Sequence, residues 1–302
     1  AIGLYEADRW VRKKFPDGSI MDEWGRIWNY EPAQKKYWLK TGTIKTPEDL
    51  DKLEPPDPLA PARLSLLQNV VRLTREKSPD NPMAVMGEVN APLVVVWEAM
   101  GMDRFMYSLA TNLPFVKRFV EYVTDHYYVP LIKAMIDMEI HLLLEVGDYA
   151  DKKGLFFHPK YFHEIVYPSL RRLVNAAHKR GVPFIKHSDG NLNAVIGDFI
   201  KETNLDGFGP LEPRAGMDFG ELKEKHGGKV CLVGNVDCAH TLTYKTTNET
   251  VAETKDVIRK ASPGGGHVLS SSNSFHSGVK LENCYAMHET GRKYGRYTLR
   301  ER

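Results

Sequence analysis

Short apolar runs alternate with longer amphipathic stretches along most of the chain. Six such runs stand at residues 81–89, 140–150, 182–190, 205–212, 229–237 and 266–274. Each is followed by a segment with helical spacing of apolar residues, as at 191–203 and 247–261. Near-continuous apolar strands that alternate with helices are typical of a parallel sheet covered by helices. The pattern therefore predicts an α/β fold.

The N-terminal part is less regular. Residues 21–30, "MDEWGRIWNY", read as two short strands around a glycine turn and predict a β-hairpin. Residues 62–78 have helical spacing and follow a proline-rich loop. We expect a single domain over residues 1–302, in which residues 1–60 form an irregular segment with this hairpin.

Polar residues stand at the C-terminal end of nearly every run. They are Glu88, Glu145, Asp148, His187, Asp189, Glu212, Asn235, Asp237, Ser272 and Asn273. In a (β/α)8 TIM barrel such strand ends converge on one mouth, which holds the active site. An open sheet would spread them along an edge, and no GxGxxG turn marks that class here. We therefore predict a barrel whose two remaining strands lie in the irregular N-terminal part or upstream of Ala1.

The stretch "IKHSDGN", residues 185–191, has the densest polar cluster at a strand end. Alternate residues of a strand point to the same face, so His187 and Asp189 should project together as a metal site or acid/base pair. An alternative is that Asp189 and Asn191 are N-cap residues of helix 191–203. Glu145 has an alternative role as the partner of a buried cation. The gathering of six polar strand ends favours an enzyme, because buried charge is costly without a use.

Composition narrows the classes of partner. A net charge of +2 gives no argument for nucleic acid or an anionic membrane. No apolar stretch approaches the roughly 20 residues that span a bilayer. The three cysteines are Cys231, Cys238 and Cys284, too few for a disulfide framework, and we expect none of them at a strand end. The cytoplasm is the expected location.

Three stretches carry a resemblance to a known family. Residues 166–191, 211–237 and 264–297 resemble the uroporphyrinogen decarboxylase superfamily, which also contains corrinoid-dependent methyltransferases. The resemblance runs from about residue 82 to residue 300 and implies a (β/α)8 barrel with its site at the C-terminal mouth.

Departures from the family pattern separate its branches. The N-terminal arginines with which the decarboxylases grip porphyrin carboxylates are not found, and Glu98 and Asn273 replace a tyrosine and a histidine of theirs. In thiol-methylating members zinc is bound by a His-x-Cys pair and a distant cysteine. His187 matches that histidine, Asp189 replaces the first cysteine, and "SSSNS" (270–274) replaces the second. An oxygen-rich site is better suited to activating oxygen than a thiol, which favours the O-demethylase branch.

The resemblance and the strand ends together assign roles. We predict that zinc is bound by His187, Asp189 and Glu212. Glu145, Asp148 and His276 would complete the catalytic set with His187 and Asp189. The predicted substrate-binding residues are Glu88, Glu98, Tyr149, Asn235 and Asn273. Expected partners are a small methylated donor, such as a methoxylated aromatic, a corrinoid protein that carries cobalamin, and a second copy in a homodimer.

Two other functions stay open at this point. One is a decarboxylase or lyase that acts on a small carboxylic acid without metal and uses His187 as general acid. The other is a barrel that binds a ligand or partner without catalysis.

Overall fold

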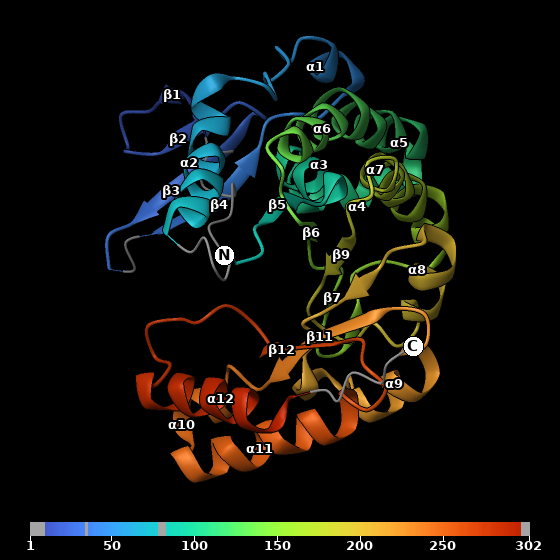
Figure 1. Cartoon of the computed structure of the whole chain (residues 1–302). Coiled ribbons are helices and arrows are strands. Elements are labelled where there is room, and N and C mark those ends of the chain that lie inside the picture. The colour runs from blue at the N-terminus through green and yellow to red at the C-terminus, as the bar shows by residue number, and fades with distance from the viewer. Residues whose placement is uncertain (1–9, 34–35, 78–82, 297–302) are drawn as a thin grey trace. The chain divides into compact units, whose positions relative to one another are not determined.

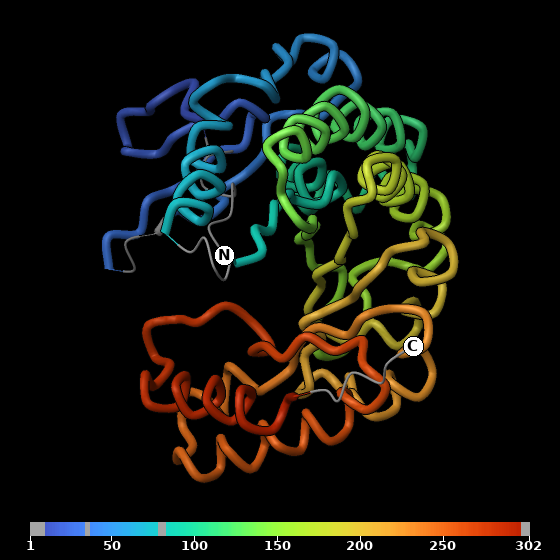
Figure 2. Tube along the Cα trace, in the orientation of Figure 1, coloured from blue at the N-terminus to red at the C-terminus, as the bar shows by residue number. Residues whose placement is uncertain are grey.

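A computed structural model describes residues 10–33, 36–77 and 83–296. The chain divides into two compact units, and each is described by itself (Figures 1 and 2). Unit 1 comprises Ala1–Val146 and Lys160–Phe184, and unit 2 comprises Gly147–Pro159 and Ile185–Arg302.

The fold is α/β, with six strands in the order β12-β11-β10-β9-β6-β5. Their bounds are β5 (Met86–Asn90), β6 (Leu142–Val146), β9 (Phe184–His187), β10 (Gly207–Phe208), β11 (Cys231–Val236) and β12 (His267–Ser271). Five of these strands lie inside their predicted apolar runs, and β5 extends one residue beyond the run predicted at 81–89. The predicted alternation of strands and helices is therefore confirmed. The β5–β6, β9–β10, β10–β11 and β11–β12 pairs are parallel.

Unit 1 begins with an antiparallel sheet. Its strands are β1 (Val11–Lys14), β2 (Ile20–Asp22), β3 (Arg26–Glu31) and β4 (Lys36–Gly42), followed by helices α1 (Pro47–Asp51) and α2 (Pro61–Lys77). The hairpin expected over 21–30 is the β2–β3 pair. Helix α2 covers residues 62–77 of the helix expected at 62–78, and residue 78 lies outside the described residues. The buried Arg26 links this sheet to helix α3 (Pro92–Met100), because its guanidinium contacts Asp22 at 2.6 Å and Glu98 at 2.8 Å.

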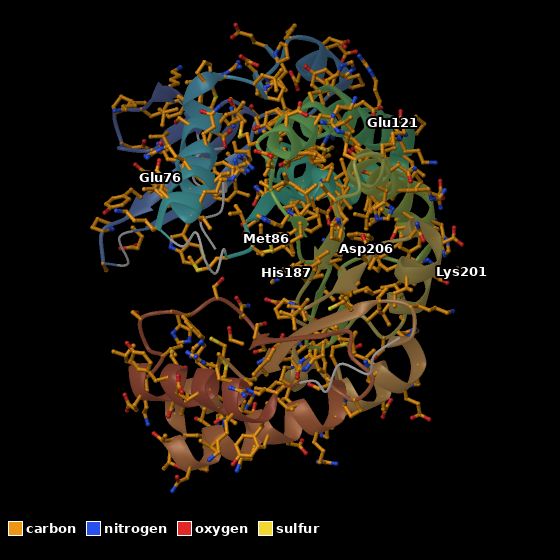
Figure 3. All side chains as sticks on the ribbon, viewed as in Figure 1. Glu76, Met86, Glu121, His187, Lys201 and Asp206 are labelled. Atoms are coloured by element: carbon orange, nitrogen blue, oxygen red, sulfur yellow. The ribbon has the colours of Figure 1, made fainter. Side chains whose placement is uncertain are left out.

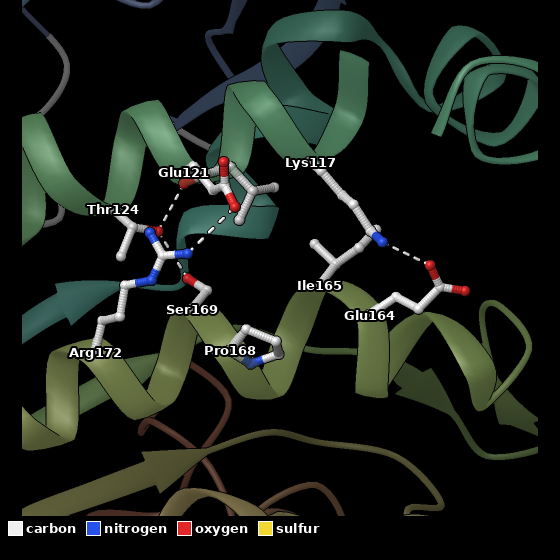
Figure 4. Close-up of a pocket in the computed structure, with 9 residues that line it drawn as sticks. Lys117, Glu121, Thr124, Glu164, Ile165, Pro168, Ser169 and Arg172 are labelled. Atoms are coloured by element: carbon white, nitrogen blue, oxygen red, sulfur yellow. Dashed lines mark hydrogen bonds and ion pairs between the residues drawn. The ribbon is translucent and has the colours of Figure 1, made fainter. Parts of the chain in front are cut away.

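The rest of unit 1 consists of β5, β6 and packed helices. These helices are α3 (Pro92–Met100), α4 (Met102–Thr111), α5 (Leu113–Tyr122), the π-helix η1 (Val123–Tyr128), α6 (Val129–Asp137), the π-helix η2 (Phe162–Val166) and α7 (Tyr167–His178). Figure 4 shows polar contacts that bridge α5–η1 to η2–α7: Lys117 pairs with Glu164 at 2.6 Å, and the Thr124 and Ser169 hydroxyls are 2.7 Å apart. The small pocket drawn there is lined by residues that bridge the two helical segments.

Unit 2 contains residues 185–187 of β9, the parallel strands β10 to β12 and the helices that connect them. Its other elements are the hairpin β7 (Ala150–Asp151) and β8 (Gly154–Leu155), α8 (Ile196–Thr203), the 3-10 turn η3 (Pro213–Ala215), α9 (Phe219–His226), α10 (Thr241–Tyr244), α11 (Thr247–Ala261) and α12 (Leu281–Tyr294). Helix α11 begins with a capping box. The Thr246 hydroxyl accepts a hydrogen bond from the backbone N–H of Glu249, and the Glu249 carboxylate accepts one from the backbone N–H of Thr246. Within the described ranges, no helix has the length and apolarity needed to cross a membrane.

Candidate functional site

Three potential metal-ligating side chains of unit 2 lie close together, at or just after the ends of strands β6 and β9. Asp148 lies two residues beyond β6, His187 is the last residue of β9, and Asp189 lies two residues further. His187 is labelled in Figure 3, which draws the side chains as sticks. The His187 Nε2 atom is 3.5 Å from Asp148 Oδ1 and 3.8 Å from Asp189 Oδ1, and the ligand atoms of all three lie within 4.8 Å of one another. We call these three residues the triad.

Only one of the two Asp189 carboxylate oxygens has a hydrogen-bond donor among the described residues. Its Oδ2 accepts a hydrogen bond from the Asn273 side-chain amide, and its backbone N–H donates to Asp148 Oδ1 at 2.8 Å. Its Oδ1 is buried and has no hydrogen-bond donor among the described residues. A buried oxygen without a donor is costly, so this atom marks the place where a cation or a proton would be stabilised.

The two carboxyl groups of the triad differ in acidity. Burial raises the pKa of Asp189 to about 6, and the negative charges of Asp148 and Glu212 add to this against the opposing effects of His187 and Asn273. Burial acts in the same direction on Asp148, but the hydrogen bond and charge of His187 outweigh it and lower the pKa of Asp148. The pair therefore combines a carboxylate that stays charged with a carboxyl that is readily protonated.

A glycine allows the triad loop to pass the β7–β8 hairpin. Gly190 has φ of +81°, and a Cβ atom there would lie 2.4 Å from the Ala150 carbonyl oxygen. The next residue, Asn191, donates its N–H to the Asp151 carbonyl at 2.8 Å. A side chain at position 190 would push this loop and Asp189 away from the hairpin, because L residues avoid this φ and the space is filled.

The N-cap interpretation of Asp189 and Asn191 is wrong. Helix α8 begins at Ile196 with Val195 as its N-cap residue. The Asn191 side chain instead accepts from the backbone N–H of Asn193 at 3.1 Å and stabilises a turn before the helix. Asp189 therefore does not cap α8, and its carboxylate lies with Asp148 and His187.

Glu212 lies near Asp189 but outside the triad. Its negative charge contributes to the raised pKa of Asp189, while its Oε1 is 3.7 Å from Lys152 Nζ on the β7–β8 turn. The sequence analysis expected Glu212 to be the third metal ligand and Asp148 to be a catalytic residue. In the structure it is Asp148 whose carboxylate lies close to both His187 and Asp189.

The other predicted residues of unit 2 have separate surroundings. Asn235 is buried and donates to the Leu211 carbonyl at 3.1 Å. Tyr149 is buried and stacks on Phe199, with a ring-centre distance of 6.1 Å. His276 is exposed in the loop after β12, with its Nε2 3.4 Å from the Thr243 hydroxyl. Of the predicted substrate-binding residues in unit 2, Asn273 is the one that contacts the triad directly through a described hydrogen bond.

Three predicted residues belong to unit 1. Glu88 lies in β5, Glu145 is buried in β6, and Glu98 lies in α3, where it pairs with the buried Arg26 at 2.8 Å. The ion pair with Arg26 gives Glu98 a role in the packing of unit 1.

A cysteine stands at a strand end, contrary to expectation. Cys238 lies two residues beyond β11, is buried, and donates its S–H to the Ser274 carbonyl at 3.4 Å. Burial raises the pKa of this thiol, with further contributions from Asp237, Cys284 and Asp189. The sequence signal was its spacing: Cys238 follows the end of β11 by two residues, as Asp189 follows the end of β9.

Comparisons with known proteins give a family and a shared fold. Residues 34–294 match the uroporphyrinogen decarboxylase (URO-D) family. No curated protein matches the chain by sequence. A methyltransferase from Methanosarcina mazei has a similar structure, with a TM-score of 0.73 and 18% identity over 91% of this chain and 77% of that one. This likeness confirms the predicted α/β barrel class.

Two sugar enzymes have lower structural similarity to this chain, with TM-scores below 0.5. A D-psicose 3-epimerase from Clostridium cellulolyticum H10 has a TM-score of 0.40 with 12% identity, over 76% of this chain and 90% of that one. A sugar phosphate isomerase/epimerase from Parabacteroides distasonis has a TM-score of 0.38 with 10% identity, over 75% of this chain and 88% of that one. Neither value shows a shared fold.

Proposed function

The chain belongs to the uroporphyrinogen decarboxylase family, and from that premise we propose that it is a methyltransferase. It would move a methyl group from a small methylated donor, with the methyl bound to oxygen, to the cobalamin of a corrinoid protein. The observation that carries the proposal is the triad of Asp148, His187 and Asp189, with a buried oxygen that has no hydrogen-bond donor among the described residues. The structural likeness to a methyltransferase supports it.

The triad fits a divalent cation such as zinc. Zinc accepts imidazole nitrogen and carboxylate oxygen at about 2.0–2.2 Å, so two tetrahedral ligand atoms lie roughly 3.3–3.6 Å apart. The two His187-to-carboxylate separations, 3.5 Å and 3.8 Å, come close to this spacing. Two carboxylates and one imidazole also give a harder donor set than thiolates. His187 Nε2, Asp148 Oδ1 and Asp189 Oδ1 would be the ligand atoms.

The chemistry requires help at the leaving oxygen. When the methyl group of an ether passes to reduced cobalamin, the C–O bond breaks and the oxygen keeps the electron pair. Alkoxides and phenoxides are basic, so this oxygen needs a cation or a proton as the bond breaks. A divalent cation, when bound, supplies Lewis acidity at that oxygen.

The surrounding residues would orient the triad and the donor. Asn273 fixes one oxygen of Asp189, which leaves the other directed toward His187. Second-shell hydrogen bonds of this kind set ligand orientation in metal sites. Glu212, paired with Lys152, would place a second carboxylate near Asp189 for contact with substrate. Glu88, Glu145, Asn235 and His276 keep their predicted roles in substrate binding or proton transfer as part of this proposal.

The family itself supports a second candidate, a carboxy-lyase that acts on a small acid without metal. In this case His187, between Asp148 and Asp189, would act as the general acid. The two candidates differ in their need for a metal and in the product, carbon dioxide or a methylated corrinoid.

One experiment separates them. The purified full chain is assayed for metal and screened for methyl transfer to reduced cobalamin from methoxylated aromatics, methylamines and methyl thiols. We expect about one zinc per chain, lost with activity in His187→Ala and Asp148→Asn. His288→Ala, a change at an exposed histidine on α12, should keep both. Because Glu212 lies outside the triad, Glu212→Gln should keep the metal.

Two results would contradict the proposal. A metal-free wild type that releases carbon dioxide from a small acid would favour the lyase. Zinc that stays bound in His187→Ala but leaves in Glu212→Gln would show that the triad is not the metal site.

A further inference from the structure

A serine and a histidine are hydrogen-bonded to each other between the end of α11 and the start of β12. The Ser262 hydroxyl lies 2.8 Å from His267 Nδ1, and His267 Nε2 lies 2.8 Å from the Gly234 carbonyl oxygen. Ser262 follows the last residue of α11 and His267 is the first residue of β12, so both belong to unit 2. We call Ser262 and His267 the dyad.

The two hydrogen bonds of His267 fix its tautomer. A carbonyl oxygen can only accept, so the contact with Gly234 places a proton on Nε2. In the neutral imidazole Nδ1 then has the lone pair, and the Ser262 hydroxyl donates to it. The imidazole is therefore held in the orientation in which it can remove the serine proton. A nucleophile, a base and a group that orients the base are the parts of an activated serine.

The imidazole is neutral near pH 7, as a general base must be. Burial lowers the pKa of His267 below the usual 6.5; the Gly234 hydrogen bond opposes this shift, and the charge of Lys223 on α9 adds to it. On α12, His288 and Arg292 line the same cavity as His267. None of these three neighbours carries a negative charge that would favour protonation of the imidazole.

The dyad lines a surface cavity of about 310 Å³. Helices α11 and α12 pack side by side there (Figure 1). Apolar side chains come from both helices and from β12: they are Ile258, Leu269 and Met287. Pockets for small molecules have volumes of about 300–1,000 Å³, mostly apolar walls and a few polar groups. This cavity is at the lower end of that range, so it suits a small substrate with an apolar part.

We propose that the dyad is a further catalytic site, which hydrolyses small esters of carboxylic acids. Ser262 Oγ bonds to the ester carbonyl carbon, and its proton passes to His267 Nδ1. The C–O bond to the alcohol breaks, and the leaving oxygen keeps the electron pair and takes the proton from His267. Water then bonds to the acyl carbon and gives a proton to His267. Ser262 Oγ leaves with that proton, and the carboxylic acid is released.

The surroundings of the dyad favour an ester as the substrate. An ester is neutral until its carbonyl oxygen gains negative charge during the attack, and Arg292 is the cation in the cavity that would stabilise this charge. His267 is oriented by a carbonyl group and not by a carboxylate, so the imidazolium gains less stabilisation than in a complete triad. An ester needs less help than an amide, because an alcohol leaves more easily than an amine.

The dyad is separate from the proposed metal site. His267 begins β12, whereas Asn273, which contacts Asp189, lies two residues beyond the end of that strand. The hydrolytic steps use only Ser262, His267, Arg292 and water. The inference therefore does not depend on the proposed methyl transfer.

Hydrolysis of p-nitrophenyl acetate and butyrate by the purified full chain tests the proposal. Wild type should release p-nitrophenolate faster than buffer, and EDTA should leave the rate unchanged. The rate should rise with pH through the pKa of His267 and become constant above pH 6.5. Ser262→Ala should reduce the rate to that of buffer, and His267→Gln should lower it by at least about a hundredfold. Ser277→Ala, at an exposed serine after β12, is the matched control and should keep the wild-type rate.

Covalent labelling identifies the nucleophile. With a fluorophosphonate, Ser262 Oγ should bond to phosphorus as fluoride leaves, and the serine proton should pass through His267 to solvent. Peptide mass spectrometry should find the label on Ser262. Circular dichroism shows that the variants are compared in their folded state, which matters because His267→Gln removes buried hydrogen bonds.

Two results would overturn the proposal: a wild type that hydrolyses both esters no faster than buffer, or a folded Ser262→Ala variant with the wild-type rate. Ester hydrolysis by a chain that binds no zinc would support the dyad and contradict the metal site, so the two proposals fail separately.

Discussion

At the scale of single residues, the buried His267 makes the stability of unit 2 depend on pH. It begins β12, where its Nε2 donates to the Gly234 carbonyl at 2.8 Å and its Nδ1 is 2.8 Å from the Ser262 hydroxyl. Burial lowers its pKa from the usual 6.5; the Gly234 hydrogen bond opposes this shift, and the charge of Lys223 adds to it. The fold therefore prefers the neutral imidazole.

The sign of the pH effect follows from this preference. Above pH 6.5 the imidazole is neutral in both states, so its contribution is fully present. As pH falls from 6.5 through the lower folded pKa, the unfolded chain binds more protons and stability is lost. Each unit of pKa difference corresponds to about 1.4 kcal/mol.

The variant His267→Gln should be less stable than wild type near neutral pH and should lose less stability on acidification. Urea unfolding near pH 7 and near pH 5 measures both effects. His288→Gln, at a histidine exposed on α12, should keep the wild-type pH slope. If His267→Gln had the same slope as wild type, another group would carry the effect.

Site residues were predictable where strand geometry still applies. His187 and Asp189 are two positions apart at the end of β9, and the two-residue period of a strand brought them together correctly. Asp148 and Cys238 each lie two residues beyond a strand. Beyond the strand ends, hydrogen bonds between loops fix the backbone. One example is the hydrogen bond from the Asp189 backbone N–H to the Asp148 carboxylate. Sequence spacing alone therefore could not show that Asp148, and not Glu212, lies in one group with His187 and Asp189.

At the scale of elements, long apolar runs were reliable and loop boundaries were not. The six strands match their predicted runs, and only β5 extends beyond its run, by one residue, because burial on both faces requires a continuous apolar segment. Helix α8 starts at Ile196, five residues after the expected start at 191, since residues 190–195 are used in contacts with the β7–β8 hairpin and in a turn. Such tertiary contacts leave no periodic signal in the sequence.

The turn after β9 gives a prediction at this scale. Gly190→Ala should destabilise unit 2 by about 1–2 kcal/mol from its positive φ, and by a further amount of about 1–3 kcal/mol because the new Cβ meets the Ala150 carbonyl. It should also weaken zinc binding, because the loop that holds Asp189 must move. Chemical unfolding and zinc titration measure the two effects.

Gly264→Ala is the matched control for that change. Gly264 is also in unit 2 and has φ of +80°, but a Cβ there would have nothing within 4 Å. Only the conformational cost should appear, with zinc affinity unchanged. Equal losses of stability in the two variants would show that the contact with the hairpin has no energetic weight.

At the scale of the whole molecule, the residues proposed to bind metal all belong to one unit. The triad and Asn273 lie within Gly147–Pro159 and Ile185–Arg302, whereas the antiparallel sheet and α2 lie in unit 1. Within the described ranges the parallel sheet has six strands, and the two further strands of the predicted barrel stay a prediction. A ligand that binds only unit 2 should stabilise local structure there first, because binding to the native state disfavours local opening.

Hydrogen exchange with and without zinc tests this separation. Amides of residues 147–159 and 185–192 should exchange more slowly with zinc, by about a hundredfold when zinc is at a hundred times its dissociation constant. Amides of β2 to β4, residues 20–42, should be unchanged, because no triad residue lies in unit 1. His187→Ala should remove the difference, which excludes binding of zinc elsewhere in unit 2. Slower exchange in residues 20–42 alone would place the metal in unit 1 and contradict the assignment of the triad.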